Sequence, residues 1–150
     1  MNVRVKNADF VLLFKNYFHF LRGVQKKRNK TPYQSMYPPL LTSIWDAMQM
    51  TTLTLPNDVL TSDKQKEVIA YLTSTICLLP CPPCTIHAMH YLAAHPVDNI
   101  KIGTDAFRWV IDFHNDVNRR LGKREYSYKE AEESMIMRLK AVLVQKEATL

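Results

Sequence analysis

Hydrophobic residues recur along most of the chain at the three- and four-residue spacing of amphipathic helices. A first such segment, residues 8–24, has one apolar side made of Phe10, Leu13, Phe14, Tyr17, Phe18 and Leu21. The most periodic segment, residues 104–121, has one side made of Phe107, Val110, Ile111, His114, Val117 and Leu121. The same pattern predicts helices over residues 40–52, 63–78, 81–95 and 127–145. The chain is therefore expected to be all-α.

Polar and proline-rich stretches separate these segments and predict the connections. Residues 25–39 are polar and then broken by prolines, so we expect a linker there, and loops at 53–62 and 96–103. Ser62 or Asp63 is a suitable N-cap for the third helix. Gly122 is placed to end a helix, and Ser127 with Glu130 has the spacing of a capping box. The sequence predicts an all-helical bundle with short connections.

Composition agrees with this fold. Only three glycines occur among 150 residues, and 47% of the residues are hydrophobic. No run approaches 18 uninterrupted apolar residues, so no transmembrane segment is expected. The apolar stretch Phe10–Phe14 runs straight into Lys15, which is not the layout of a signal peptide. We therefore expect a cytoplasmic protein.

The positive charge is concentrated in the N-terminal part. Residues 1–36 hold eight Lys or Arg residues against one acid, whereas the rest of the chain holds 12 basic and 13 acidic residues. A nucleic-acid site would rest on the cluster Lys26–Lys30 alone, and a solvated arm is the expected alternative. An acidic membrane surface or a protein partner would fit that arm about as well. We expect an amphipathic and basic extension over residues 1–36, followed by the main domain over residues 37–150.

The cysteines carry the clearest chemical signal. Cys77, Cys81 and Cys84 are too few for the disulfide scaffold of a secreted protein. Cys81 and Cys84 form a C-x-x-C pair with Pro82 and Pro83 between them, at the predicted start of a helix. The positive end of that helix would stabilise a thiolate, so a redox-active disulfide is favoured.

Two other interpretations of the cysteines stay open. Zinc could be bound by Cys81, Cys84 and His87 with Cys77 or His90, although no second pair of ligands follows elsewhere in the sequence. The thiols could also be ordinary buried residues, which is the simplest interpretation of Cys77.

The segment after Trp109 has unusual polar positions on an apolar helix face. His114 and Asn118 are four residues apart and share one face, with Asn115 at its flank. Buried polar groups need hydrogen-bond partners, and a lone histidine there usually finds one in the protein core. Three such groups, followed by the basic residues Arg119, Arg120 and Lys123, are better explained by a bound cofactor with ring heteroatoms and phosphates.

Together these motifs resemble one family. The pattern C-x-x-C-x-x-H (Cys81, Cys84, His87), followed after about twenty residues by W-x₄-H-N-x-V-N-x-x-L-x-K starting at Trp109, resembles the Erv/ALR flavin-linked sulfhydryl oxidases. The upstream Trp45 fits as well. The similarity covers about residues 40–138 and is greatest to the short forms encoded by large cytoplasmic DNA viruses.

The resemblance implies a four-helix bundle with a short fifth helix, FAD as the cofactor and a homodimer. It implies that Cys84 reacts with the flavin and that Cys81 exchanges with the substrate dithiol, with oxygen reduced to hydrogen peroxide. It implies that FAD is held by Trp45, Gln49, His87, His114, Asn115, Val117, Asn118 and Lys123. The substrate would be a thiol-containing protein such as a thioredoxin-like carrier, in the host cytoplasm or associated with the virion.

The sequence also departs from the family. Gln49 stands where the family has histidine, and Leu41 where it has glycine. No cysteine follows Cys84, so neither a second structural disulfide nor a shuttle C-x-x-C is present. The alternatives are a zinc-stabilised binding module whose basic arm contacts nucleic acid, and an inactive relative that serves as a scaffold.

Overall fold

The computed structural model describes residues 37–147, which form five α-helices and one short 3₁₀ turn. The elements are α2 (Tyr37–Leu53), α3 (Ser62–Cys77), α4 (Pro82–Ala94), η2 (Val97–Asn99), α5 (Gly103–Arg120) and α6 (Tyr128–Glu147). The all-α prediction is confirmed. The predicted helix over residues 8–24 and the basic arm lie outside the described residues.

Two helix starts differ from the sequence prediction for local reasons. α2 begins at Tyr37 instead of residue 40, because prolines are tolerated in a first turn, where backbone N–H groups have no helical partner. α3 is capped by Thr61 instead of Ser62 or Asp63. The Thr61 hydroxyl accepts a hydrogen bond from the backbone N–H of Lys64 at 3.3 Å.

The predicted capping box at the start of α6 is present. The backbone N–H of Glu130 donates to the Ser127 hydroxyl at 3.2 Å, and the backbone N–H of Ser127 donates to the Glu130 carboxylate at 2.8 Å. Gly122 lies just past α5 with a φ of 65°, which glycine adopts without strain. The local signals that end α5 and begin α6 were therefore predicted correctly.

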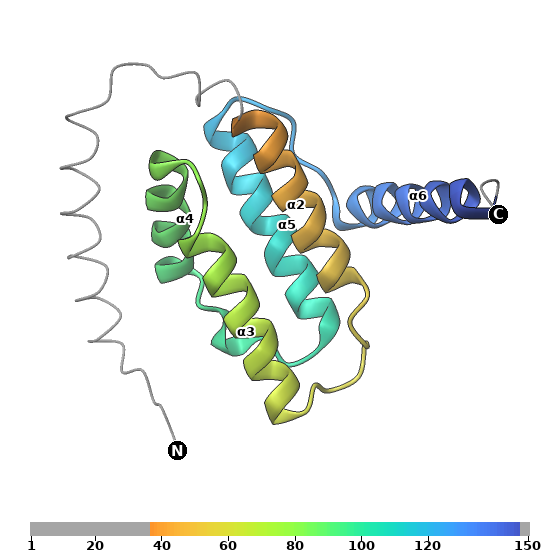
Figure 1. The fold of residues 1–150 in the computed structure, drawn as a ribbon. Helices are drawn as coiled ribbons and strands as arrows, with labels where there is room; N and C mark the ends of the chain where they lie inside the picture. The colour runs from red at the N-terminus through yellow and green to blue at the C-terminus, as the bar shows by residue number, and fades with distance from the viewer. Residues whose placement is uncertain (1–36, 148–150) are drawn as a thin grey trace.

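Helices α2 to α5 form the four-helix bundle, and α6 leads away from it (Figure 1). α2 packs mainly against α5, and α3 against α4. The main core cluster joins residues of all four helices, among them Met48, Leu72, Leu92 and Val110. It also includes residues from the connection between α2 and α3 and from the connection between α4 and α5. α6 is tied to α2 by an ion pair between Arg138 and Asp46 at 2.5 Å.

α6 confirms the helix predicted over residues 127–145, and with 20 residues it is longer than the short fifth helix that the resemblance implies. Its first half buries Ala131 and Met135, whereas Met137 is 71% exposed. Within residues 37–147 no helix is both long and apolar enough to cross a membrane.

Candidate functional site

A disulfide between Cys81 and Cys84 lies at the start of α4. Cys81 occupies the N-cap position, and the two prolines fill the first positions of the helix, where a missing N–H is harmless. The buried Thr85 hydroxyl donates to the carbonyl oxygens of Leu79 and Cys81 at 3.1 and 3.2 Å, which fixes the turn that precedes the helix. The pair is therefore held at the positive end of α4, as the sequence predicts.

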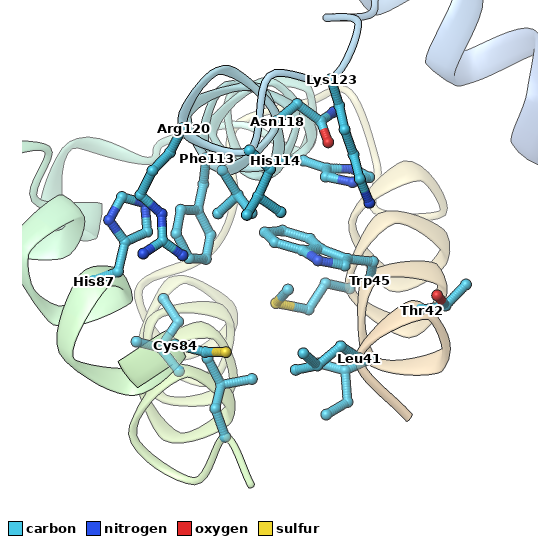
Figure 2. A pocket seen from close by; sticks show the side chains of 16 residues that line it. Leu41, Thr42, Trp45, Cys84, His87, Phe113, His114, Asn118, Arg120 and Lys123 are labelled. Carbon is cyan, nitrogen blue, oxygen red and sulfur yellow. The ribbon is translucent and has the colours of Figure 1, made fainter. Parts of the chain in front are cut away.

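Cys84 lies in the wall of a cavity of about 320 Å³. Figure 2 shows Cys84 pointing into this space from α4, with Trp45 from α2 and His114 from α5. Seven residues predicted from the sequence line it: Trp45, Cys84, His87, His114, Val117, Asn118 and Lys123. We call this space the disulfide cavity. Cys81 is not among its lining residues.

A second cavity of about 430 Å³ lies between α2, α5, α6 and the segment that joins α5 to α6. It contains the remaining two predicted cofactor residues, Gln49 and Asn115. Thr42, Trp45 and His114 line both spaces, so the two cavities adjoin along these three residues. We call this space the α6 cavity.

Trp45 and His114 form the wall between the cavities. Their rings stack with centroids 4.3 Å apart and planes inclined by only 9°. Trp45 also contacts Phe113 at a centroid distance of 4.9 Å, which anchors the indole in the core. A rigid aromatic pair of this kind offers flat surfaces to a planar ligand on either side.

The disulfide cavity has a positive bias. Its lining includes Arg120 and Lys123 and no carboxylate. Burial lowers the pKa of His114, and the charge of Lys123 lowers it further, against a smaller raising effect of Asp46. Burial and then Arg120 lower the pKa of His87, against a raising effect of Asp116. Both imidazoles are therefore neutral at pH 7, while the two long cationic side chains remain available to an anion.

One buried nitrogen atom at the disulfide cavity, Nδ2 of Asn118, lacks a hydrogen-bond partner within the described part of the chain. Nε2 of His87, by contrast, lies 2.9 Å from Oδ2 of Asp116, and that carboxylate is its partner in the protein. An unpartnered buried polar atom is costly, so a polar ligand beside Asn118 would relieve the cost.

Asn115 is differently placed. Its amide nitrogen donates to the carbonyl oxygen of Tyr126 at 2.8 Å, and its amide oxygen accepts from the Tyr126 backbone N–H at 2.9 Å. This pair of bonds fastens the segment between α5 and α6 to α5. Asn115 thus shapes the α6 cavity, and its predicted contact with the cofactor stays a prediction.

Some lining residues were not among the eight cofactor residues that the resemblance implies. Arg120 and Phe113 line the disulfide cavity, and so do Leu41 and Thr42 of α2. Arg120 had a sequence signal, because it lies six residues after His114 in a basic run. Thr42 had none, since its place at the cavity depends on how α2 packs on α5.

The zinc arrangement weighed from the sequence is not assembled. Among residues 37–147, no group of three or more His, Cys, Asp or Glu side chains is arranged to hold a metal ion. Cys77 is a free, half-buried thiol whose pKa is raised by burial, and it does not line the disulfide cavity.

Comparison with known families gives a match over residues 42–136 to the model of the Erv1 / Alr family, which is more than half of the chain. The chain belongs to the Erv1/Alr family. The matched range holds the C-x-x-C pair, both tryptophans and every predicted cofactor residue.

Relatives within the Erv1/Alr family include FAD-linked sulfhydryl oxidases of African swine fever virus. Those of the isolates Pig/Kenya/KEN-50/1950 and Tick/Malawi/Lil 20-1/1983 are each 38% identical over 64 residues, covering 43% of this chain and 53% of theirs. The chain therefore spans about half the length of these curated relatives.

Solved structures show the same fold. The yeast Erv1 core matches with a TM-score of 0.60 at 19% identity, covering 73% of this chain and 87% of that one. A cysteine-to-serine double mutant of Erv1 from Saccharomyces cerevisiae matches with a TM-score of 0.59 at 18% identity, covering 72% and 86%. The helical bundle of the Erv1/Alr family is thus the fold of this chain.

Proposed function

We propose that the protein is an FAD-dependent thiol oxidase that forms disulfide bonds in partner proteins and passes the electrons to oxygen, giving hydrogen peroxide. The observation that carries the proposal is the position of Cys84. One sulfur of a C-x-x-C disulfide lies in the wall of a cavity that also offers stacked aromatic rings, the unpartnered buried amide nitrogen of Asn118 and two cations.

The cavity residues fit FAD. The planar flavin suits the apolar part of the disulfide cavity, whose wall includes Trp45 and Phe113. The pyrophosphate suits Arg120 and Lys123, and the adenine nucleotide suits the adjoining α6 cavity. We assign cofactor binding to Trp45, Gln49, His87, His114, Asn115, Val117, Asn118 and Lys123.

Bound FAD would supply a two-electron acceptor that oxygen can regenerate. The chain's own chemistry is thiol–disulfide exchange. A substrate thiolate attacks the Cys81 sulfur, a mixed disulfide forms, and Cys84 leaves as a thiolate. A second substrate thiolate then attacks the mixed disulfide, which releases the oxidised substrate and leaves Cys81 reduced. The helix N-terminus stabilises the negative charge on Cys84, which makes this sulfur the better leaving group.

The positions of the two sulfurs support the roles that the family resemblance implies for them. Cys84 lines the disulfide cavity, whereas Cys81 does not line it and lies half-buried at the N-cap of α4. Cys81 is therefore the sulfur that we assign to the protein substrate. Cys84 is the sulfur that we assign to the flavin.

Several further parts of the proposal come from the resemblance and the viral relatives. We propose a homodimer that acts on a thiol-containing protein such as a thioredoxin-like carrier, in the host cytoplasm or in the virion. The oxidase domain would span residues 37–150, with residues 1–36 as an amphipathic and basic extension for which we do not expect nucleic acid as the partner.

The absorbance spectrum of the purified full-length protein tests the proposal. We expect a flavin spectrum that bleaches when a dithiol is added without oxygen and returns when oxygen is admitted. Cys84→Ala should lose thiol oxidation and keep the flavin, whereas Cys77→Ala should keep both. A colourless protein containing one zinc per chain would overturn the proposal.

A further inference from the structure

Gln49 is one of the few buried polar side chains of α2, with 5% of its surface exposed. Its amide nitrogen lies 2.8 Å from Nδ1 of His114, a residue 65 positions further along the chain. This hydrogen bond joins α2 to α5 at the wall between the two cavities. Gln49 itself lines only the α6 cavity, whereas His114 lines both.

The bond restricts the proton on the imidazole ring. An amide nitrogen can only donate a hydrogen bond, so Nδ1 must accept it and cannot carry a proton. A neutral imidazole then has its single N–H at Nε2. The lowered pKa of His114 agrees with a neutral ring, since burial and Lys123 outweigh Asp46.

The same bond and the stack fix the ring in space. His114 lies parallel to Trp45, and the hydrogen bond from Gln49 opposes rotation of the imidazole out of that plane. A histidine at position 49 could donate, accept or become charged, so it would not select one tautomer of its partner. The departure from the family at this position therefore has a specific physical consequence.

We propose that Gln49 is a positioning residue that holds His114 as the neutral Nε2–H tautomer, so that His114 offers one fixed hydrogen-bond donor to an acceptor atom of the flavin nucleotide. The donor role rests on the proposed function. The tautomer itself is a property of the chain and can be measured whether or not the protein oxidises thiols.

Nitrogen NMR on the full-length protein labelled with ¹⁵N-histidine tests the first part. The shifts of the two His114 nitrogens distinguish the tautomers, with an assignment from a His114→Gln sample. We expect Nδ1 unprotonated and Nε2 protonated at pH 7, with and without FAD. A protonated Nδ1 would overturn the proposal, because Gln49 would then present its amide oxygen instead of its nitrogen.

Two matched variants test whether Gln49 is what holds His114 in the Nε2–H tautomer. Gln49→Met keeps a similar size and shape but removes the donor, whereas Thr52→Val removes a buried hydroxyl that bonds only to its own helix, to the carbonyl oxygens of Met48 and Gln49. We expect Gln49→Met to yield a mixture of tautomers and to weaken FAD binding by roughly five- to tenfold, the value of one hydrogen bond. Thr52→Val should change neither.

The outcomes separate this proposal from the proposed function. An Nε2–H tautomer that persists in Gln49→Met would overturn the role of Gln49 even if the protein oxidises thiols. A wild-type protein that binds no FAD would overturn both the proposed oxidase function and the role of His114 as a donor to the flavin nucleotide. The tautomer of His114 would still show whether Gln49 positions the ring. If Gln49→Met does not fold, the hydrogen bond can be tested in the wild type through a scalar coupling between the Gln49 and His114 nitrogens. A measured coupling would support the bond, and its absence would overturn it.

Discussion

Asn115 and Asn118 lie three residues apart on α5, yet they differ in what their amide nitrogens contact. The Asn115 nitrogen donates to the Tyr126 carbonyl, whereas the buried Asn118 nitrogen has no hydrogen-bond partner within the described residues. Asn118 is 5% exposed and lines the disulfide cavity. One asparagine therefore contributes to the fold, whereas the other leaves a buried donor unused by the described residues.

This difference predicts opposite effects of the same substitution. Asn118→Leu should stabilise the flavin-free protein by about 1 kcal/mol, because it removes a buried polar atom without a partner. It should also weaken FAD binding by roughly tenfold, since the donor is lost. Chemical denaturation of the flavin-free protein and titration with FAD measure the two effects.

Asn115→Leu is the control, since it removes two hydrogen bonds to Tyr126. We expect it to destabilise the flavin-free protein by about 2 kcal/mol. If Asn118→Leu destabilises the protein as much as Asn115→Leu does, the Asn118 amide has a partner in the folded chain and is not reserved for a ligand.

The two histidines of the disulfide cavity predict a loss of stability in mild acid. The pKa of His87 and that of His114 are both lowered from the ordinary value of 6.5. The unfolded chain therefore binds more protons than the folded chain below pH 6.5, and the free energy of unfolding falls as the pH decreases towards the lowered values.

Denaturation of the flavin-free protein between pH 7 and about pH 5 measures this effect, above the range in which carboxylates with pKa values near 4 titrate. A double variant, His87→Gln with His114→Gln, should show a flatter pH dependence than the wild type. Equal slopes in the two proteins would mean that other groups cause the acid sensitivity.

The contact between Asp116 and His87 predicts how the pKa of His87 changes when the carboxylate is removed. Its carboxylate lies 2.9 Å from His87 Nε2 and raises the pKa of that histidine, against burial and Arg120. Asp116→Asn should therefore lower the pKa of His87 further. An NMR titration of the His87 ring measures the shift.

Asp112→Asn is the matched control, because Asp112 accepts a hydrogen bond from the Tyr128 hydroxyl at 2.7 Å and is not among the groups that shift the pKa of His87. A similar shift in both variants would show that His87 responds to the net charge of α5 and not to its contact with Asp116.

The sequence predicted what depends on short-range chemistry. The position of Cys81 at the start of α4 and the capping box of Ser127 follow from residues within one helical turn, so the structure agrees with both. The family resemblance also identified seven residues that line one cavity, contributed by α2, α4, α5 and the segment after α5.

What the sequence could not predict depends on contacts between distant segments. Whether Asn115 or Asn118 has a partner is decided by the path of the chain at Tyr126, eleven positions after Asn115. The partner of Gln49 is 65 positions away, so its hydrogen bond to His114 has no local signal. The separation of the site into two cavities likewise follows from the packing of α2 on α5.

Among the substitutions considered, we expect replacement of Gly103 to lower the free energy of unfolding most. It begins α5, where its backbone N–H donates to the carbonyl oxygen of Pro56 at 3.0 Å. A Cβ atom at this position would lie 2.5 Å from that oxygen and 2.7 Å from the Cβ of Leu55. The oxygen belongs to the backbone and the Cβ atom is bonded directly to it, so neither can turn aside and the loop before α3 would have to separate from α5.

We therefore expect Gly103→Ala to destabilise the protein by about 3 kcal/mol, the upper range for overpacking. Gly122→Ala is the control, because Gly122 has a positive φ but no atom within 4 Å of an added Cβ. It should cost only about 1 kcal/mol, the backbone strain alone. Thermal unfolding of both variants measures the difference, and equal losses would show that the loop at Pro56 yields easily.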